Sequence, residues 1–400
     1  MSAEATRPGF ADVAEARVRV AGVVRETPVY RSEAMSTVAG RRVLLKAECL
    51  QRTGSFKLRG AYNTIAQLGE DERRRGVVTA SAGNHGQAVA WAAREIGAIA
   101  TIFVPESAPM PKIEAARGYG AEVVRSGDSF DDTVLAAEAF RGREGATYVH
   151  AFDDPRVIAG QGTLGLELAA QVPEGAGVVV VPIGGGGLVS GIAIALRELR
   201  PDLRVVGVQA SACAPFAGRA PSGATIADGI AVKVPGRLTA PIVAELVDEI
   251  VVVDDDEISR AIVFLLERAK VVAEGAGAAA VAALLARKVA GDDPACAVVA
   301  GGNIDPTTLI SVVRYGLTSS GRYLVVGVLI PDRPGQLAQI VATVARERAN
   351  IISIEHHREG RNIGVLQTEA ELTLETRDEE HSRRVVEALE QEGYLVRRAR

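Results

Sequence analysis

Short apolar segments alternate with helical segments from about residue 77 to residue 208, and this alternation is the feature that most constrains the fold. Most of the apolar segments are continuous runs rich in valine, isoleucine and alanine. Strands with two apolar faces belong to parallel sheets that helices cover on both sides. The sequence therefore predicts a doubly wound α/β fold, in which ligands bind at the carboxyl ends of the strands. The expected strands are 43–48, 77–80, 99–104, 122–125, 148–151, 178–182, 205–208 and 297–300.

A different pattern begins near Ser319-Ser320-Gly321. The segments after it follow the order strand, helix, strand, strand, helix, strand, and the strands alternate polar and apolar residues as a half-exposed sheet does. This order is typical of the ferredoxin-like fold. We therefore expect one domain over residues 1–320, with a smaller subdomain at about 50–155, and a separate ferredoxin-like domain over 321–400.

Composition excludes several classes of partner. The net charge is −5 and no basic stripe is present, which argues against nucleic acid and anionic membranes. No apolar run reaches the length of a membrane-spanning helix, and the N-terminus lacks a signal peptide's apolar core. The three cysteines lie far apart and the five histidines are scattered, so we expect neither disulfides nor a metal site. We expect a cytoplasmic protein.

Lys57 stands between a glycine-containing turn and a helix, because Gly54 precedes it and apolar residues at helical spacing follow it. Burial and the positive end of a helix dipole both lower the pKa of an ammonium group. An amine that is neutral near pH 7 can attack a carbonyl and hold it as a Schiff base. The structural alternative is a solvated lysine at a helix start. Scarcity favours the reactive amine, since the chain has six lysines among 45 basic residues and only this one lies in a Ser/Gly turn.

Four consecutive glycines, Gly184 to Gly187, follow the expected strand 178–182 and open a helix at Leu188. Their backbone N–H groups can converge at the positive end of the helix, which is a phosphate-binding arrangement. The alternative is a tight turn required only by packing. Glu274-Gly275-Ala276-Gly277 interrupts an expected helical stretch at 257–286, and we do not interpret it as a nucleotide motif because no strand precedes it.

A second strand-to-helix turn is Ser81-Ala82-Gly83-Asn84-His85-Gly86. Exposed N–H groups of such a turn suit a carboxylate, and the Asn84 amide offers a donor and an acceptor to a ring substituent. His85 could act as a base, although a histidine in a turn is more often a structural hydrogen-bond partner. Together, a phosphate site, a Schiff-base lysine and an asparagine beside a ring hydroxyl describe a pyridoxal phosphate enzyme.

Six motifs, in this order, resemble those of the threonine dehydratase (threonine ammonia-lyase) family of tryptophan-synthase-β-like, fold type II enzymes. The resemblance covers about residues 10–318, and the C-terminal segment resembles an ACT regulatory domain, with Asp332-Arg333-Pro334-Gly335-Gln336-Leu337 at its first turn. The motifs are Ser55-Phe56-Lys57-Leu58-Arg59-Gly60, Ser81 to Gln87, Ala159-Gly160-Gln161-Gly162-Thr163, Gly184 to Gly187, Thr225-Ile226-Ala227-Asp228-Gly229 and Gly301-Gly302-Asn303.

The resemblance implies that Lys57 holds pyridoxal 5'-phosphate and then removes the Cα proton of the substrate. Phe56 and Asn84 would position the ring, with Ala300 beside the pyridine nitrogen, and Gly184 to Gly187 with Leu188 would hold the phosphate. The carboxylate of the substrate would lie against Ser81, Ala82, Asn84 and His85. The implied activity is elimination of water from L-threonine to give 2-oxobutanoate and ammonia, and from L-serine to give pyruvate.

Three positions depart from the family pattern. Ala82 stands where serine racemases of the family carry a second serine, which favours elimination over racemisation. Ala300 stands where the family has a serine that faces the pyridine nitrogen, and alanine cannot donate that hydrogen bond. Gln209 and Pro215 stand where metal-dependent relatives have carboxylate ligands, so no strong divalent-cation site is expected. Two rival functions remain: a serine racemase or hydroxyaspartate dehydratase, and a catalytically weak sensor of amino acids.

The ACT-like segment implies control by a small amino acid such as isoleucine or valine. The turn at Gly335 presents backbone N–H groups to an anion. The expected effector residues are Asp332, Gly335, Gln336 and Leu337, with Asn350 at the start of the neighbouring strand. A single small sheet leaves unpaired edges, and we therefore expect a homodimer or homotetramer.

Overall fold

The computed structural model describes residues 6–359 and 363–398. Its contacts divide the chain into two compact units, one ending at Ile304 and one beginning at Asp305. The division falls ahead of helix α13 (Pro306–Ser319), which sequence analysis assigned to the first domain. The predicted boundary at residue 320 stays a prediction.

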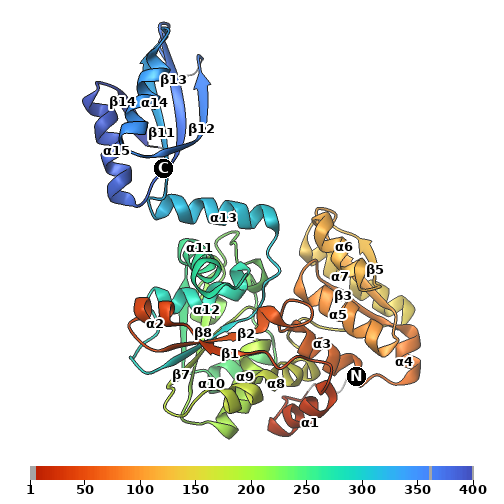
Figure 1. Cartoon of the computed structure of the whole chain (residues 1–400). Coiled ribbons are helices and arrows are strands. Elements are labelled where there is room, and N and C mark those ends of the chain that lie inside the picture. Colours follow the sequence, from red (N-terminus) through yellow and green to blue (C-terminus); the bar gives the residue numbers. More distant parts are fainter. Residues whose placement is uncertain (1–5, 360–362, 399–400) are drawn as a thin grey trace. The chain divides into compact units, whose positions relative to one another are not determined.

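The first unit contains a six-stranded sheet in the order β1-β2-β10-β7-β8-β9. Figure 1 labels four of these strands, β1, β2, β7 and β8. The edge strand β1 is antiparallel to β2, and all other neighbours are parallel. Every residue of the two central strands β10 and β7 is buried, which is why both read as unbroken apolar runs in the sequence. The strands are β1 (Val29–Arg31), β2 (Val43–Ala47), β7 (Val178–Pro182), β8 (Arg204–Ala210), β9 (Glu249–Val253) and β10 (Ala295–Val299).

Helices from distant parts of the chain pack around this sheet. The pair α8 and α9 makes the most extensive helix–helix contact, and buried valine, leucine and isoleucine side chains of both fill the core under the sheet. The helices are α1 (Phe10–Val20), α2 (Glu33–Ala39), α8 (Pro155–Gln171), α9 (Gly187–Leu199), α10 (Thr239–Leu246), α11 (Asp255–Phe264) and α12 (Gly275–Leu285).

A smaller, four-stranded sheet lies within the range 50–155 that the sequence analysis gave to a subdomain, and those bounds stay a prediction. All of its strands are parallel, in the order β5-β4-β3-β6. The strands are β3 (Val77–Ala80), β4 (Ala100–Val104), β5 (Glu122–Arg125) and β6 (Thr147–Tyr148), and the helices are α3 (Lys57–Ile65), α4 (Glu70–Arg75), α5 (Asn84–Ile96), α6 (Met110–Gly118) and α7 (Phe130–Glu144).

The second unit carries an antiparallel sheet in the order β12-β13-β11-β14, with α14 and α15 as its connecting helices. Alternate residues of β13 are buried, so one face of the sheet packs into a core. The elements are α13, β11 (Tyr323–Pro331), α14 (Gln336–Arg346), β12 (Asn350–His357), β13 (Gln367–Glu375), α15 (Glu379–Gln391) and β14 (Leu395–Arg398). The predicted fold class, two doubly wound sheets followed by a ferredoxin-like domain, is confirmed.

Several local predictions were wrong. Helix α5 begins at Asn84, so Asn84 and His85 belong to the first helical turn rather than to the loop. The stretch expected to be helical at 257–286 breaks earlier than predicted: α11 ends in a turn of π-helix (Leu265–Ala269), Lys270 takes φ 59°, and α12 starts at Gly275. Strand β9 and helix α13 were not predicted. Within the described ranges, no helix has the length and apolar character that a membrane span requires.

Candidate active site

The side chain of Lys57 is the first of helix α3, as predicted. Its Nζ donates a 2.7 Å hydrogen bond to the carbonyl oxygen of Ala151 and lies 5.2 Å from the centre of the Phe56 ring. Burial lowers the pKa of Lys57 to about 8, and the nearby Glu274 carboxylate opposes that shift. A substantial fraction of this amine is therefore neutral just above pH 7, the state in which it is a nucleophile.

The backbone before Lys57 is fastened to the end of strand β10. Ser55 forms a β-bridge with Gly301, and the N–H of Phe56 donates to the carbonyl oxygen of Ala300. Gly54 has φ +75°, and a Cβ there would lie 2.3 Å from Oδ1 of Asn303. Ala300 is thus placed beside the lysine segment by its main chain.

The four glycines connect β7 to α9 in a tightly packed loop. Gly186 has φ +95°, and a Cβ on Gly185 would lie 2.4 Å from the ring of Phe152. The hydroxyl of Thr239 donates to the carbonyl oxygen of Gly185 at 2.5 Å. Packing thus requires glycine here, independently of any ligand. The loop also leads into Leu188 at the start of α9, where the first N–H groups of a helix have no partner within the helix.

The segment Ala151–Phe152 joins the lysine to the glycine loop. Ala151 accepts the Lys57 hydrogen bond, and Phe152 contacts Gly185 and Gly187. The carboxylate of Asp153 accepts N–H bonds from Arg237 and Leu238, which ties this segment to the loop before α10. Two motifs more than 120 positions apart in the sequence therefore meet at one place.

The Ser81–His85 segment follows strand β3. Ser81 Oγ accepts the N–H of Gly83 at 3.2 Å, and Ala82 is half-buried beside it. His85 is buried, its Nε2 donates to the carbonyl oxygen of Val149 at 2.9 Å, and burial lowers its pKa to about 3. That donation leaves Nδ1 as an acceptor, which does not suit a carboxylate. Any contact of His85 with a substrate carboxylate would therefore use its backbone N–H.

Asn84 is held between two side chains of the larger subdomain. Its Nδ2 donates to Oε1 of Glu274 at 2.6 Å, and its Oδ1 accepts from Nδ2 of Asn303 at 2.7 Å. The sequence motifs of Asn84 and Asn303 are thus brought together. Glu274 was missed. The only signal was its position, an acidic residue in the apolar stretch that ends at the Gly275-Ala276-Gly277 interruption.

A buried ionic cluster lies behind the lysine. Arg59 donates to Glu48 at 2.7 and 2.8 Å and to Glu167 at 2.7 and 3.0 Å, and Lys46 donates to Glu167 at 2.6 Å. All four side chains are buried, and they come from β2, the turn after it, α3 and α8. Two positive and two negative charges cancel here, which a buried group of ions requires. The cluster anchors the helix on which Lys57 stands.

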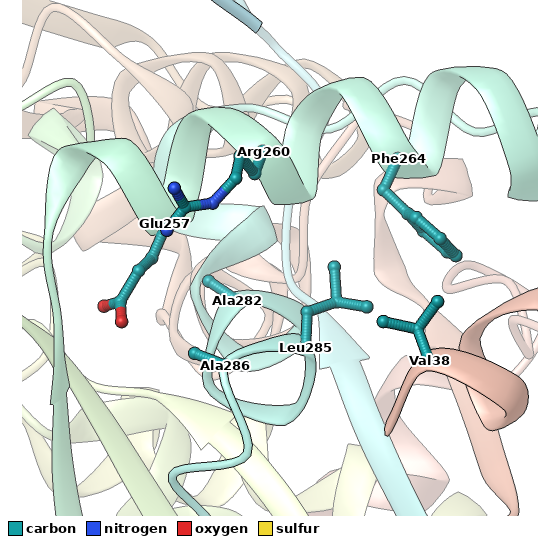
Figure 2. Close-up of a pocket in the computed structure, with 7 residues that line it drawn as sticks. All are labelled: Val38, Glu257, Arg260, Phe264, Ala282, Leu285 and Ala286. Carbon is teal, nitrogen blue, oxygen red and sulfur yellow. The ribbon is translucent and has the colours of Figure 1, made fainter. Parts of the chain in front are cut away.

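A cavity of about 260 Å³ lies elsewhere, between α2, α11 and α12 (Figure 2). The apolar side chains of Val38, Phe264 and Leu285 turn toward one another there, with Glu257 and Arg260 further along α11. None of the predicted site residues lines it.

The positions related to metal sites have other partners. Gln209 Oε1 accepts the N–H of Ala217 at 3.1 Å, and Pro215 begins a short 3₁₀ turn (Pro215–Ala217). In residues 6–359 and 363–398, no group of three or more His, Cys, Asp or Glu side chains has the geometry to hold a metal ion.

The predicted effector residues lie at opposite ends of the second sheet. Asp332 to Leu337 form the turn from β11 into α14, with Gly335 at φ +91°. Asn350 is paired with Glu375, which in turn is paired with Tyr323 at the start of β11. Since β11 spans nine residues, roughly 25–30 Å separates the two ends. One copy of the sheet therefore does not bring Asn350 to the Gly335 turn.

Comparison with known proteins agrees with this geometry. The model of the family described as "Pyridoxal-phosphate dependent enzyme" matches residues 20–301, and that of the ACT domain matches residues 324–393. The chain belongs to the pyridoxal-phosphate-dependent enzymes. The predicted cofactor and the predicted resemblance, fold type II followed by an ACT domain, are thereby confirmed.

Relatives match over nearly the whole chain. An L-threonine ammonia-lyase of Thermotoga maritima is 46% identical over 394 residues, which cover 96% of this chain and 98% of the relative. Among solved structures, the processed form of threonine deaminase isoform 2 from Solanum lycopersicum has a TM-score of 0.72 and 34% identity, covering 78% of this chain and 90% of that one. Maize serine racemase has a TM-score of 0.73 and 35% identity, covering 78% and 99%.

Proposed function

We propose that this chain is an L-threonine ammonia-lyase that converts L-threonine to 2-oxobutanoate and ammonia and also accepts L-serine. The observation that carries this proposal is the proximity of three predicted site features. Lys57 donates to Ala151, next to the Phe152 ring that packs on the Gly184–Gly187 loop, and Asn84 donates to Glu274, whose charge acts on Lys57. The relative named L-threonine ammonia-lyase, which matches both units, supports the choice of substrate.

The residues present fit pyridoxal 5'-phosphate. The Lys57 side chain is half-buried and its pKa is lowered to about 8, and the glycine loop ends at the N-terminus of α9, where a phosphate is favoured. In the described part of the chain, the buried hydroxyls of Ser55 and Ser190 have no hydrogen-bond partner. Ser55 lies two positions before Lys57 and Ser190 in the first turns of α9, so both are near groups that would hold the cofactor.

The roles of the residues follow from their positions. When bound, pyridoxal phosphate supplies an electron sink for negative charge at Cα. Lys57 Nζ would hold the cofactor and, as a free amine, would take the Cα proton of the substrate. Phe56 and Asn84 would position the ring, and the N–H groups at the start of α5 would orient the substrate carboxylate. Loss of the Cα proton and the β-hydroxyl releases water. Water then adds back as ammonia leaves, which gives the 2-oxo acid.

The proposal is tested by incubating purified, cofactor-loaded protein with L-threonine and measuring 2-oxobutanoate and ammonia. Equal amounts of both products are expected, and pyruvate is expected from L-serine. If the protein binds the cofactor and releases neither product, the proposal fails and the sensor alternative is favoured.

A second candidate is serine racemase, which the similarity to the maize enzyme favours. Racemisation needs a proton donor on the ring face opposite Lys57, and Ala82 has no group that can donate. We expect no D-serine from L-serine. Formation of D-serine at a rate comparable to that of pyruvate would contradict this choice.

The ACT domain supports regulation by an amino acid such as isoleucine or valine. In the turn at Asp332 to Leu337, the N–H groups of Asp332, Arg333 and Gln336 donate to backbone carbonyl oxygens, which leaves those of Gly335 and Leu337 for a carboxylate. We expect either amino acid to change threonine turnover in the full chain, and Gln336→Ala to reduce that response. Glu380→Ala on exposed α15 is the matched control. An unchanged turnover with both amino acids would remove this part of the proposal.

The unpaired edges of the second sheet, at β12 and β14, support a homodimer or homotetramer. Light scattering of the purified protein tests this, and a monomer at micromolar concentration would contradict it. A cytoplasmic location completes the proposal.

A further inference from the structure

Glu274 has an unusual position for a buried carboxylate. It directly precedes the first residue of α12, but its side chain makes no hydrogen bond to the N–H groups of that helix. It turns instead toward the other subdomain, where Oε1 accepts from Nδ2 of Asn84 at 2.6 Å. Its own N–H donates to the carbonyl oxygen of Gly301. The Glu274 carboxylate therefore does not cap α12 and instead binds a residue 190 positions away, which indicates a role outside that helix.

The hydrogen bonds around Asn84 determine which of its atoms are free. Asn303 donates to Oδ1 of Asn84, and Asn84 donates one Nδ2–H to Glu274. An amide has two N–H groups and one carbonyl oxygen, so one N–H is left for another acceptor. Asn303 donates both of its N–H groups, one to Asn84 and one to the carbonyl oxygen of Thr53, so it holds the oxygen side of the Asn84 amide while Glu274 holds the nitrogen side. With both partners in place, the amide plane is fixed and its second N–H is the donor toward the site.

The neighbouring backbone leaves space for this carboxylate. A Cβ on Gly301 would lie 2.3 Å from Oε1 of Glu274 and 3.2 Å from Nδ2 of Asn84. Any other residue at 301 would displace the Glu274–Asn84 pair. Two residues of the Gly301-Gly302-Asn303 motif thus support the Glu274–Asn84 pair. Gly301 leaves space for it, and Asn303 donates a hydrogen bond to Asn84.

Charged and titratable groups face Glu274 from several elements. Burial, helped by the charge of Asp228, raises the pKa of Glu274 to about 7, although the Asn84 hydrogen bond, Lys112 and Lys57 act to lower it. The thiol of Cys49 also interacts electrostatically with the Glu274 carboxylate, which helps to raise the pKa of that thiol. Glu274 and Lys57 thus each influence the pKa of the other, Glu274 raising that of the amine and Lys57 lowering that of the carboxyl.

We propose that Glu274 is a positioning residue for the elimination reaction: it holds the Asn84 amide with an N–H directed at the cofactor ring, and its charge balances that of the lysine side of the site. This inference rests on the proposed function for the identity of the reaction. The cofactor itself is established by the family. Glu274 acts through Asn84 and does not itself touch the substrate.

The experiment compares Glu274→Gln and Glu274→Ala with the wild-type holoenzyme. Two readouts are used: the visible absorbance of bound cofactor between about pH 5.5 and about pH 9, and kcat and KM for threonine. Glutamine can still accept from Asn84 but carries no charge. We expect it to remove a spectral transition with a midpoint near pH 7 while KM stays within about threefold. Glu274→Ala removes the charge and also the hydrogen-bond acceptor of the Asn84 amide. We expect it to shift the absorbance band and to lower kcat on the order of 10²-fold.

Two further variants separate positioning from a general structural effect. In an Asn84→Ala background, Glu274→Ala should have little additional effect on the spectrum, because the two residues act as a unit. Glu245→Gln, a surface change at the end of α10, should leave both readouts unchanged. Circular dichroism verifies that each variant is folded.

The inference is overturned if folded Glu274→Gln and Glu274→Ala keep the wild-type spectrum and its pH dependence, or if the Glu274 and Asn84 effects on the spectrum simply add. The spectrum does not depend on turnover. If wild-type protein fails to convert threonine while the Glu274 variants lose the transition near pH 7, the proposed substrate is wrong and the role of Glu274 in orienting Asn84 is upheld.

Discussion

The amine of Lys57 and the carbonyl oxygen of Ala151 are joined by a 2.7 Å hydrogen bond, one residue before the ring against which the glycine loop packs. This bond gives the buried amine a partner without giving it a counter-charge. A carbonyl accepts from the ammonium and from the neutral amine alike, so burial can lower the pKa of Lys57. The bond thus holds the lysine in place and leaves its pKa lowered, as the covalent role that we propose for it requires.

Replacement of Lys57 should abolish covalent cofactor binding. After borohydride reduction, the wild type should retain the cofactor mass on the peptide that contains Lys57, and Lys57→Ala should retain none. Threonine turnover should fall by at least about 10²-fold, because a positioned base contributes that much or more. Lys288→Ala, which removes a surface partner of Glu257, is the control and should behave as wild type. Yellow, active Lys57→Ala protein would refute the assignment.

Capture of the cofactor by cofactor-free protein should depend on pH. The neutral amine is the reactive form, and the pKa of Lys57 is lowered to about 8. The rate should therefore rise between about pH 6 and about pH 9 with a midpoint near 8, whereas an ordinary lysine has a midpoint near 10.4. Stopped-flow absorbance at each pH measures this rate. A midpoint close to 10 would show that burial does not lower the pKa of this amine.

A methyl group added to the glycine loop should damage the site. The Cβ of Gly185→Ala would lie 2.4 Å from the Phe152 ring, so the loop or the ring must move. Overpacking of this kind costs roughly 1–3 kcal/mol of stability, and we also expect weaker cofactor binding, measured by equilibrium dialysis. Gly142→Ala in α7 is matched, because nothing lies within 4 Å of its added Cβ. It should leave stability equal or higher. Equal behaviour of the two variants would contradict the packing argument.

The central strands β7 and β10 were predictable because burial of every residue leaves a direct trace in the sequence. The edge strand β9, in which only two of five residues are buried, was not predicted. The start of α5 was placed too late. Gly83 and Asn84 together read as a turn, and no side chain caps this helix. Conversely, α13 carried the signal of Asp305 followed by Pro306, and Asp305 indeed caps it, but the segment was overlooked.

Hydrogen bonds between site residues that are far apart in the sequence could not be predicted from local sequence patterns. Lys57, Asn84 and the glycine loop each follow a turn with recognisable chemistry. Glu274 does not, because its importance arises from a partner on another subdomain. The same holds for Arg59, whose two carboxylate partners are 11 and 108 positions away. Tertiary contacts of this kind have no periodicity in the sequence.

Arg59 provides the last test, since it stands two residues after Lys57 and is fully buried between Glu48 and Glu167. Removing one partner of a buried ionic group leaves the other charges uncompensated, which costs about 3–5 kcal/mol. Arg59→Met should therefore lower the free energy of unfolding, measured in urea, by about that amount. Its apolar side chain nearly fills the space, so the loss arises from charge rather than from a cavity. Arg141→Met removes an exposed pair with Glu138 and should cost no more than about 1 kcal/mol. Equal losses for the two variants would mean that the buried cluster does not anchor the helix of Lys57.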